Sequence, residues 1–316
     1  MKTALLFPGQ GAQHVGMMAD VAAASAAARR LFERADAQLG YSLSALCFAG
    51  PAERLNTTEI SQPAIFVCSA AMLAAVYEAL GQEHLPDVVM MAGLSLGEYT
   101  ALYAADAIDF DPALDLVARR GRYMQEAAEA RRGGMVSVLG LDEPTVGEIC
   151  RAAAEGDTLV EANFLCPGNI VLSGDLAACE RVEALAAQRG AMKTVRLEVA
   201  GAFHSPHMAP AAEKLAEALS AVEFRRPRCP VIANVDAQEH CCAEMIRERL
   251  VAQVTSPVRW EASMRKLLDN GVESFYEIGP GRVLGGLMRR IHRRAAVVSL
   301  NGADALAKLA GGAAGP

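Results

Sequence analysis

The sequence lacks the segments that mark a membrane or exported protein. No apolar run reaches the ~18 residues expected of a membrane-spanning helix. The amino terminus passes from Met1–Thr3 into a short apolar stretch and a Pro-Gly turn, without the apolar core and small-residue cleavage site of a secretory signal. We therefore expect a cytoplasmic protein that has no membrane partner.

The sequence also lacks the features expected of a metal-binding, redox or nucleic-acid-binding protein. The eight cysteines include no C-x-x-C pair, and Cys241 and Cys242 are adjacent, which is a poor spacing for zinc. Reduced, buried thiols are the expected state. There is no dinucleotide-binding fingerprint, so we expect neither a metal nor a redox cofactor. The formal charge of −7 argues against a nucleic-acid partner, and an anionic ligand would need a local basic patch.

The bulk composition is that of an ordinary globular protein. At 316 residues, and with about 150 residues per domain as a prior, one large domain or two are expected. Hydrophobic residues make up 52% and charged residues 21% of the chain, and no internal repeat is visible.

A G-x-S-x-G pattern at Gly93–Gly97 is the most informative feature present. It follows the apolar run Val88–Ala92 directly, and an apolar strand that leads into this pattern is typical of a nucleophile elbow. Both glycines are expected because side chains would clash where strand, turn and helix crowd together. The helix that follows would direct N–H groups and its positive dipole end toward an oxyanion forming beside Ser95.

Strands that alternate with helices predict an α/β fold with a mainly parallel, doubly wound sheet, similar to that of the α/β-hydrolases. Outside the middle of the chain, strands are expected at 4–7, 87–92, 230–234, 273–278 and 296–300, and helices near 17–40, 62–81, 112–129, 208–221, 243–253, 260–270 and 282–293.

The pattern changes after Arg131–Gly134. Strands at 135–140, 158–163, 169–173 and 193–199 and helices at 143–154 and 176–189 give the order β-α-β-β-α-β of a ferredoxin-like unit. We therefore predict a large α/β catalytic domain made of 1–131 and 201–316, and an inserted ferredoxin-like subdomain at 132–200. The glycine-rich tail at 311–316 is expected to be frayed.

A serine hydroxyl is a weak nucleophile until a neighbouring base takes its proton. His204 is the best placed of six histidines, since it follows a strand and a small-residue turn at the sheet edge where the elbow lies; His207 is the alternative. A further group should fix the imidazole tautomer. The sequence does not choose between a backbone carbonyl and the aspartates between serine and histidine, which are Asp106, Asp109, Asp115, Asp142, Asp157 and Asp175.

Seven short motifs occur in a fixed order between about residues 3 and 301. They are Phe7–Gly11, Gly93–Tyr99, Arg120–Gly121, Ala202–Ser205, Asn234–Asp236, Pro257–Trp260 and Glu277–Gly281. With this ordered set the chain resembles the malonyl-CoA:acyl carrier protein transacylase family of fatty acid synthesis, which also includes polyketide acyltransferase domains. The resemblance implies a malonyltransferase with malonyl-CoA and acyl carrier protein as partners, and the coenzyme A thioester as substrate instead of a cofactor.

The resemblance also implies roles for the reacting groups. Ser95 carries the acyl group as an ester, and His204 serves as its general base and acid. Backbone N–H groups of Gln10 and Leu96 form the oxyanion hole, and a backbone carbonyl near Gln253 orients the histidine.

Four further residues are implied in substrate and carrier recognition. Arg120 would pair with the free malonate carboxylate, because a guanidinium fork binds a carboxylate bidentately and discriminates malonyl from acetyl. Without the family pattern, a solvated charge on a helix face would be the expectation for this arginine. Phe203 would leave little room for an α-methyl group, Asn163 would keep the fold of a substrate loop, and Lys193 would take part in carrier docking.

Other basic residues are candidates for binding the coenzyme A phosphates and the acidic carrier. They are Arg196, Arg289, Arg290, Arg293 and Arg294. The chain departs from the family pattern at three positions. Leu94 replaces a common histidine, which predicts a changed pocket, and Leu165 and Asn169 stand where Asn and Gln are frequent.

Two other functions share the same elbow. A serine esterase or thioesterase would resolve the ester with water, and a non-catalytic carrier-binding scaffold would keep the fold without the reaction. Arg120 and the inserted unit favour acyl transfer.

Overall fold

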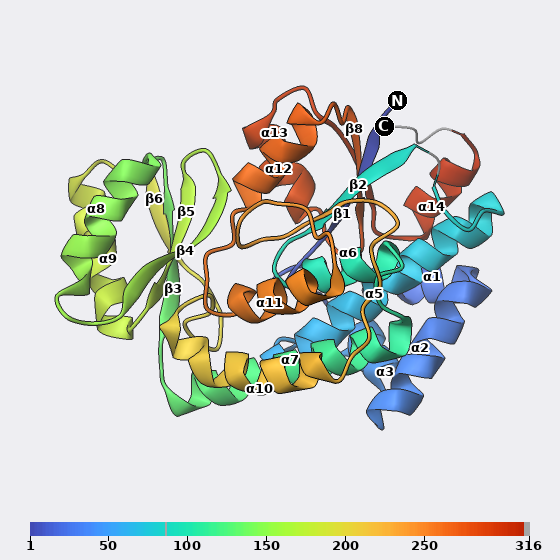
Figure 1. The fold of residues 1–316 in the computed structure, drawn as a ribbon, viewed down its shortest axis with the longest axis horizontal. Helices are drawn as coiled ribbons and strands as arrows, with labels where there is room; N and C mark the ends of the chain where they lie inside the picture. Colours follow the sequence, from blue (N-terminus) through green and yellow to red (C-terminus); the bar gives the residue numbers. More distant parts are fainter. Residues whose placement is uncertain (86, 313–316) are drawn as a thin grey trace.

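Two β-sheets organise the computed structural model, which describes residues 1–85 and 87–312 (Figure 1). The larger sheet has the order β7-β2-β1-β8-β9, and all its pairs are parallel. Its strands are β1 (Thr3–Phe7), β2 (Val88–Gly93), β7 (Val231–Ile232), β8 (Ser274–Ile278) and β9 (Ala296–Leu300). The prediction of an α/β fold with a mainly parallel sheet is confirmed.

Helices cover both faces of this sheet. Leu5 and Phe7 of β1 pack into a core with α5 (Thr58–Leu80), whereas Ala4 and Leu6 pack into a second core with α12 (Trp260–Asp269). Because both faces are buried, the strand is apolar throughout and does not alternate with polar residues. The carboxyl ends of its parallel strands meet at one edge, where ligands bind in open α/β sheets.

Most of the helices expected from the sequence are present. Around the larger sheet, the structure has α1 (Ala19–Ala24), α2 (Ala26–Leu39), α3 (Leu43–Ala49), α4 (Ala52–Leu55), α6 (Gly97–Ala104), α7 (Phe110–Ala130), α10 (Ala209–Ser220), α11 (Ala243–Gln253), α13 (Val283–Ile291) and α14 (Ala303–Ala310), together with α5, α12 and the 3₁₀ turn η1 (Pro206–Met208). The helical stretch expected near 17–40 is divided between two helices, α1 and α2. It is broken at Ser25, whose hydroxyl accepts a hydrogen bond from the Ala28 N–H and so begins α2.

By length and apolarity, α5 is the one helix in the described part of the chain that could cross a membrane. However, 72% of its most apolar window is buried inside the protein, as in a central core helix.

The cysteines are free thiols, and five of the eight are buried, while Cys241 is exposed.

The smaller sheet is antiparallel and has the order β4-β5-β3-β6. It consists of β3 (Gly134–Leu139), β4 (Leu159–Cys166), β5 (Asn169–Gly174) and β6 (Lys193–Arg196), and its core is shared with α8 (Glu143–Ala154) and α9 (Leu176–Gln188). The chain order β3-α8-β4-β5-α9-β6 is the one expected from the sequence, although β6 ends three residues early. Of the tail predicted to be frayed, 313–316 lie outside the described residues.

The two sheets meet along the segment that follows α11. Val258 donates its N–H to the carbonyl of Ala162 at 2.8 Å and accepts from the Phe164 N–H at 2.9 Å, so this segment lies beside β4. The small sheet therefore borders the carboxyl-end edge of the large one (Figure 1).

Candidate active site

Ser95 lies on a sharp turn between β2 and α6, with a left-handed φ of 50° that non-glycine residues rarely adopt. The glycines on either side are sterically required. A Cβ on Gly93 would lie 1.9 Å from the carbonyl carbon of Gly97, and one on Gly97 would lie 2.2 Å from the carbonyl oxygen of Phe7. The clash expected from the sequence at these two positions is confirmed.

The side chain of Asn234, which follows β7, fixes the turn from the neighbouring strand. It accepts a hydrogen bond from the Ser95 N–H at 2.7 Å and donates one to the carbonyl of Gly93 at 2.8 Å. This clamp stabilises a backbone conformation that is unfavourable by itself.

His204 is the histidine that meets the serine. Its Nε2 lies 2.8 Å from the Ser95 Oγ, and its Nδ1 lies 2.8 Å from the backbone carbonyl oxygen of Gln253. Because a carbonyl only accepts, Nδ1 carries the proton and Nε2 presents its lone pair to the hydroxyl. Among the described residues no carboxylate is hydrogen-bonded to this imidazole, so the aspartates left open by the sequence do not orient it. The alternative base, His207, lies against Asp175.

The environment keeps His204 neutral. Burial is the largest influence and the nearby Arg120 guanidinium is the second, and together they lower the pKa of the imidazole to about 4. The Gln253 carbonyl acts in the opposite direction but is the weaker influence. At neutral pH the ring is therefore in the form that can accept the serine proton.

Arg120 of α7 is 1% exposed, so the alternative of a solvated charge on the helix face is wrong. Its Nη1 donates to Gln62 Oε1 at 2.6 Å, and its Nη2 donates to Gln253 Oε1 at 2.9 Å and to Ser95 Oγ at 3.0 Å. Burial lowers the pKa of this guanidinium, which nonetheless remains charged. Because its acceptors are amides and a hydroxyl, the site holds a positive charge without a hydrogen-bonded carboxylate, and it favours an anion beside the serine.

Glu98 lies fully buried beneath the elbow, and sequence reasoning gave it no role. One carboxylate oxygen accepts from the Asn234 N–H at 3.0 Å and from Gln253 Nε2 at 2.7 Å, and the other accepts from His240 Nε2 at 2.8 Å. Gln253 Nε2 also donates to the carbonyl of Ser95 at 3.0 Å. A single carboxylate thus joins the residues that hold the serine, the histidine and the arginine.

The expected oxyanion donors lie on two neighbouring loops. Gln10 follows β1 and Leu96 opens α6. The loop after β1 packs tightly on the elbow, since a Cβ on Gly9 would lie 2.2 Å from the carbonyl oxygen of Leu94. Within the described residues, neither the Gln10 nor the Leu96 N–H donates a hydrogen bond.

The remaining candidate residues lie on other elements and differ in burial. Phe203 is buried next to His204 in the sequence and packs in the larger core. Asn163 is half-buried on β4 beside Val258, and Lys193 is exposed at the start of β6. Asn169 accepts a hydrogen bond from a serine within the small sheet, so this departure from the family pattern has a structural contact.

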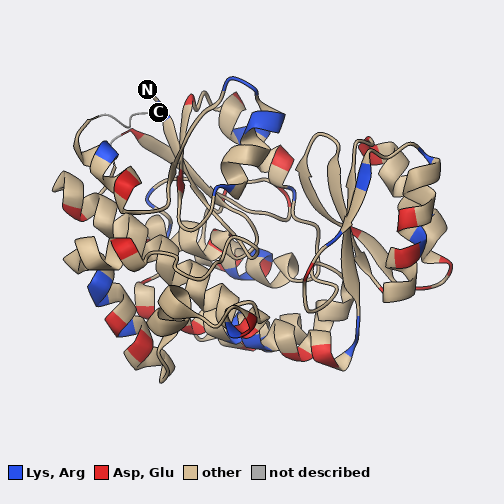
Figure 2. Ribbon diagram, turned by 180° about the vertical axis from the view of Figure 1, so that it is seen from behind, with Lys and Arg blue, Asp and Glu red and all other residues tan. Residues whose placement is uncertain are grey.

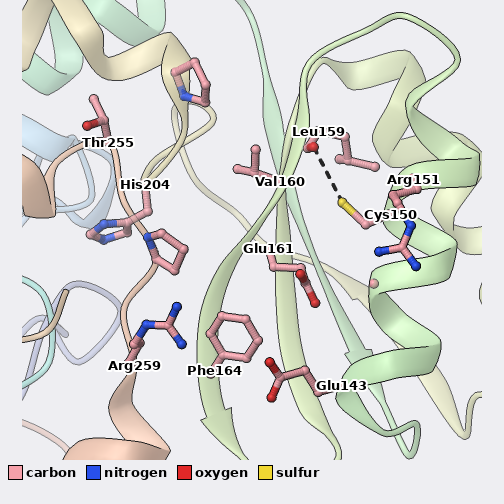
Figure 3. A pocket seen from close by; sticks show the side chains of 13 residues that line it. Glu143, Cys150, Arg151, Leu159, Val160, Glu161, Phe164, His204, Thr255 and Arg259 are labelled. Carbon is pink, nitrogen blue, oxygen red and sulfur yellow. Dashed lines mark hydrogen bonds between the residues drawn. The ribbon is translucent and has the colours of Figure 1, made fainter. Parts of the chain in front are cut away.

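A cavity of about 460 Å³ lies between the small sheet and the turn that carries His204 (Figure 3). Its walls combine opposite charges from Arg151, Glu161 and Arg259 with the ring of Phe164, over which the Arg259 guanidinium lies at 5.7 Å. Burial raises the pKa of the Glu161 carboxyl. His204 lines this cavity, together with Pro206 and Thr255. In the described part of the chain no cluster of three or more His, Cys, Asp or Glu could hold a metal ion.

Comparison with known proteins gives consistent matches over nearly the whole chain. The acyl transferase domain family matches residues 4–302. The malonyl CoA-acyl carrier protein transacylase of Escherichia coli K12 is 42% identical, with 96% of this chain and 97% of that protein covered. The transacylase of Bacillus subtilis is 43% identical, with 95% and 93% covered.

Solved structures agree. The malonyl CoA-acyl carrier protein transacylase of Coxiella burnetii superposes with a TM-score of 0.94 at 37% identity, covering 98% of this chain and 97% of that one. A malonyl-transacylase solved in complex with a type II polyketide acyl-carrier protein superposes with a TM-score of 0.94 at 39% identity, covering 99% and 100%.

Proposed function

The chain belongs to the malonyl-CoA:acyl carrier protein transacylase family of acyl transferases, and from this membership we infer that it moves a malonyl group from malonyl-CoA to acyl carrier protein. The observation that best supports the mechanism is the 2.8 Å contact between Ser95 Oγ and His204 Nε2. It gives the chain an activated alcohol for a ping-pong transfer through an ester on Ser95.

In the first half-reaction, Ser95 Oγ attacks the thioester carbonyl of malonyl-CoA while His204 Nε2 takes its proton. The N–H groups of Gln10 and Leu96 stabilise the oxyanion of the tetrahedral intermediate. The carbon–sulfur bond then breaks, and the imidazolium returns its proton to the departing coenzyme A thiolate. The second half-reaction runs the same steps in reverse, with the phosphopantetheine thiol of the carrier as the nucleophile that releases the serine.

Arg120 binds the free carboxylate of the malonyl group in this proposal. Its guanidinium already lies within hydrogen-bond distance of the Ser95 oxygen that becomes the ester oxygen. A carboxylate two carbons beyond the ester carbonyl is therefore within reach, and an acetyl group offers no such anion. Phe203, buried beside the histidine, supports a pocket with little room for an α-methyl group.

We also propose that the chain forms two domains. Residues 132–200 form the inserted ferredoxin-like subdomain, and 1–131 with 201–316 form the α/β-hydrolase-like catalytic domain; the antiparallel order β4-β5-β3-β6 supports this. Lys193, which is exposed on the subdomain, and Arg289 and Arg290 in the last turn of α13 are the proposed contacts for an acidic carrier. Figure 2 shows where Lys and Arg residues lie along the chain. The cytoplasm is the proposed location, and no cofactor other than the substrate thioester is proposed.

The decisive experiment measures coenzyme A release and intact protein mass after brief exposure to malonyl-CoA. A transferase should gain the mass of one malonyl group, release one equivalent of coenzyme A, and turn over only when carrier protein is added. Continuous coenzyme A release without carrier would instead identify a thioesterase, and an unmodified protein would identify a non-catalytic scaffold.

A further inference from the structure

The backbone that carries His204 is strained. Its φ of 56° is left-handed, and such a conformation in a non-glycine residue persists only where the surroundings fix it. The side chain of this histidine contacts Ser95 and the Gln253 carbonyl, which both belong to the part of the chain around the large sheet. The residues on either side of the histidine contact the small sheet instead.

The first contact comes from Ser173, a fully buried residue of β5. Its hydroxyl donates a hydrogen bond of 2.7 Å to the carbonyl oxygen of Phe203. That carbonyl belongs to the peptide group joined to the nitrogen of His204. The hydroxyl therefore fixes the peptide plane from which the catalytic histidine projects.

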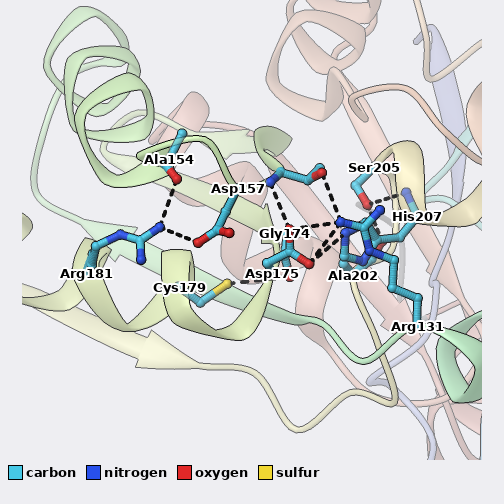
Figure 4. Close-up of polar contacts among 11 residues, drawn as sticks. Arg131, Ala154, Asp157, Gly174, Asp175, Cys179, Arg181, Ala202, Ser205 and His207 are labelled. Atoms are coloured by element: carbon cyan, nitrogen blue, oxygen red, sulfur yellow. Dashed lines mark hydrogen bonds and ion pairs between the residues drawn. The ribbon is translucent and has the colours of Figure 1, made fainter.

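The second contact comes from Asp175, which directly follows β5 (Figure 4). One of its carboxylate oxygens lies 3.2 Å from Nε2 of His207, whose side chain is fully buried. The other lies 3.0 Å from the Arg131 guanidinium and accepts from the Thr158 N–H at 2.8 Å. The charged groups that face His207 are thus one carboxylate and one guanidinium.

These contacts lie on opposite sides of the catalytic residue. The peptide before His204 accepts a hydrogen bond from Ser173, and Asp175 lies 3.2 Å from the ring of the residue three positions after it. Gly133, at the entry to the small sheet, allows this close approach, because a Cβ there would lie 2.7 Å from the Ala202 Cβ and 2.9 Å from His207 Nδ1.

We propose that Ser173 and Asp175 of the small sheet are positioning residues for His204, which hold the turn Phe203–His207 so that Nε2 faces the serine hydroxyl. The small sheet would then support the catalytic base in addition to forming one wall of the cavity. The proposal rests on the proposed function, because the rate that it affects is that of Ser95 acylation.

Ser137 provides a matched control. It is also buried and lies on β3, next to β5, and its hydroxyl donates to Asn169 Oδ1 at 2.9 Å, within the small sheet. Ser173→Ala and Ser137→Ala each remove one hydroxyl and one hydrogen bond from the same sheet. Only the first removes a contact to the catalytic turn.

The experiment compares the full-length wild type with Ser173→Ala, Ser173→Thr and Ser137→Ala. We expect Ser173→Ala to lower kcat for malonyl transfer about tenfold with little change in KM, because the reacting atoms are displaced while the substrate contacts remain. Ser173→Thr, which keeps the hydroxyl, should restore the rate, and Ser137→Ala should stay near the wild type. Urea unfolding of each variant separates this effect from lost stability.

A wild-type kcat in Ser173→Ala would overturn the role of Ser173, as would equal losses in the two alanine variants. Asp175→Asn tests the second contact, since it keeps the size of the side chain but removes the charge opposite His207; an unchanged kcat would remove Asp175 from the proposal. Labelling of Ser95 by a neutral serine-directed acylating probe is measured in parallel. It reports on His204 even if malonyl is not the substrate, so failure of the proposed function and failure of this inference remain distinguishable.

Discussion

The Arg120 guanidinium donates a hydrogen bond of 3.0 Å to the same Ser95 oxygen that lies 2.8 Å from His204 Nε2. The nucleophile is therefore held between a neutral base and a buried cation. The cation favours the alkoxide that forms as the proton leaves, and it also lowers the pKa of the histidine. After acylation the serine no longer offers a free hydroxyl, and we expect the malonyl carboxylate to take its place beside the arginine.

Replacement of Arg120 by alanine should therefore depress malonyl transfer and spare acetyl transfer. A charge-assisted hydrogen bond contributes about 1.5–3 kcal/mol, which corresponds to roughly a tenfold to hundredfold loss of malonyl preference. The measurement is the ratio of kcat/KM for malonyl-CoA to that for acetyl-CoA. Arg119→Ala is the control, because the neighbouring arginine is exposed and pairs with Asp115 on the helix surface. An unchanged ratio in Arg120→Ala would contradict the assigned role.

Ser95→Ala should abolish the acyl-enzyme. The hydroxyl is the atom that forms the ester, and no other serine or threonine hydroxyl is hydrogen-bonded to His204 in the described part of the chain. Intact-protein mass after exposure to malonyl-CoA should show the malonyl increment in the wild type and not in the variant. Malonyl transfer at the wild-type rate by the variant would refute the mechanism.

The parts of this site that could be predicted are those that a short, local sequence pattern determines. The elbow at Gly93–Gly97 requires glycines at fixed spacing because the backbone there approaches within van der Waals contact, so the pattern itself indicates the geometry. His204 was expected from its place after a strand at the elbow's sheet edge, and it does contact Ser95, although that strand, β6, ends at Arg196 and belongs to the smaller sheet. The β-α-β-β-α-β order was readable because each element is long enough to have a period.

The parts that could not be predicted depend on contacts between distant residues or on the backbone. A carbonyl that orients a histidine leaves no mark in the sequence, so Gln253 came from the family resemblance alone. Glu98 and His240 are 142 residues apart and meet only because β2 and β7 are neighbours. Three helices went unpredicted: α3, α4 and α14 span seven, four and eight residues, which is too short for a clear apolar period.

Removal of the Glu98 carboxylate should destabilise the whole fold. Glu98→Leu removes the acceptor of three buried N–H groups, and a buried donor left unsatisfied costs about 1–3 kcal/mol. Glu98→Gln should be less harmful, because one amide oxygen still accepts and the imidazole of His240 can change its tautomer to accept from the amide nitrogen. Urea unfolding is the measurement, with Glu33→Gln, at an exposed position of α2, as the control. Equal stability of Glu98→Leu and the wild type would exclude this network as a structural support.

The rate of Ser95 acylation should fall on the acid side of its pH profile (the acid limb) only near pH 4. Burial lowers the pKa of His204 to about 4, well below the 6.5 of an ordinary histidine. Below its pKa the imidazole is protonated and cannot accept the serine proton, whereas above it the neutral base is ready; a lowered pKa therefore extends activity into acid. The rate of labelling by a neutral acylating probe, followed as a function of pH, measures this limb without titration of the substrate. Since the Arg120 charge is the second cause of the shift, Arg120→Ala should move the limb to higher pH. A wild-type limb near 6.5, or one that does not respond to loss of the guanidinium, would mean that the catalytic imidazole is hydrated and distant from that charge during the reaction.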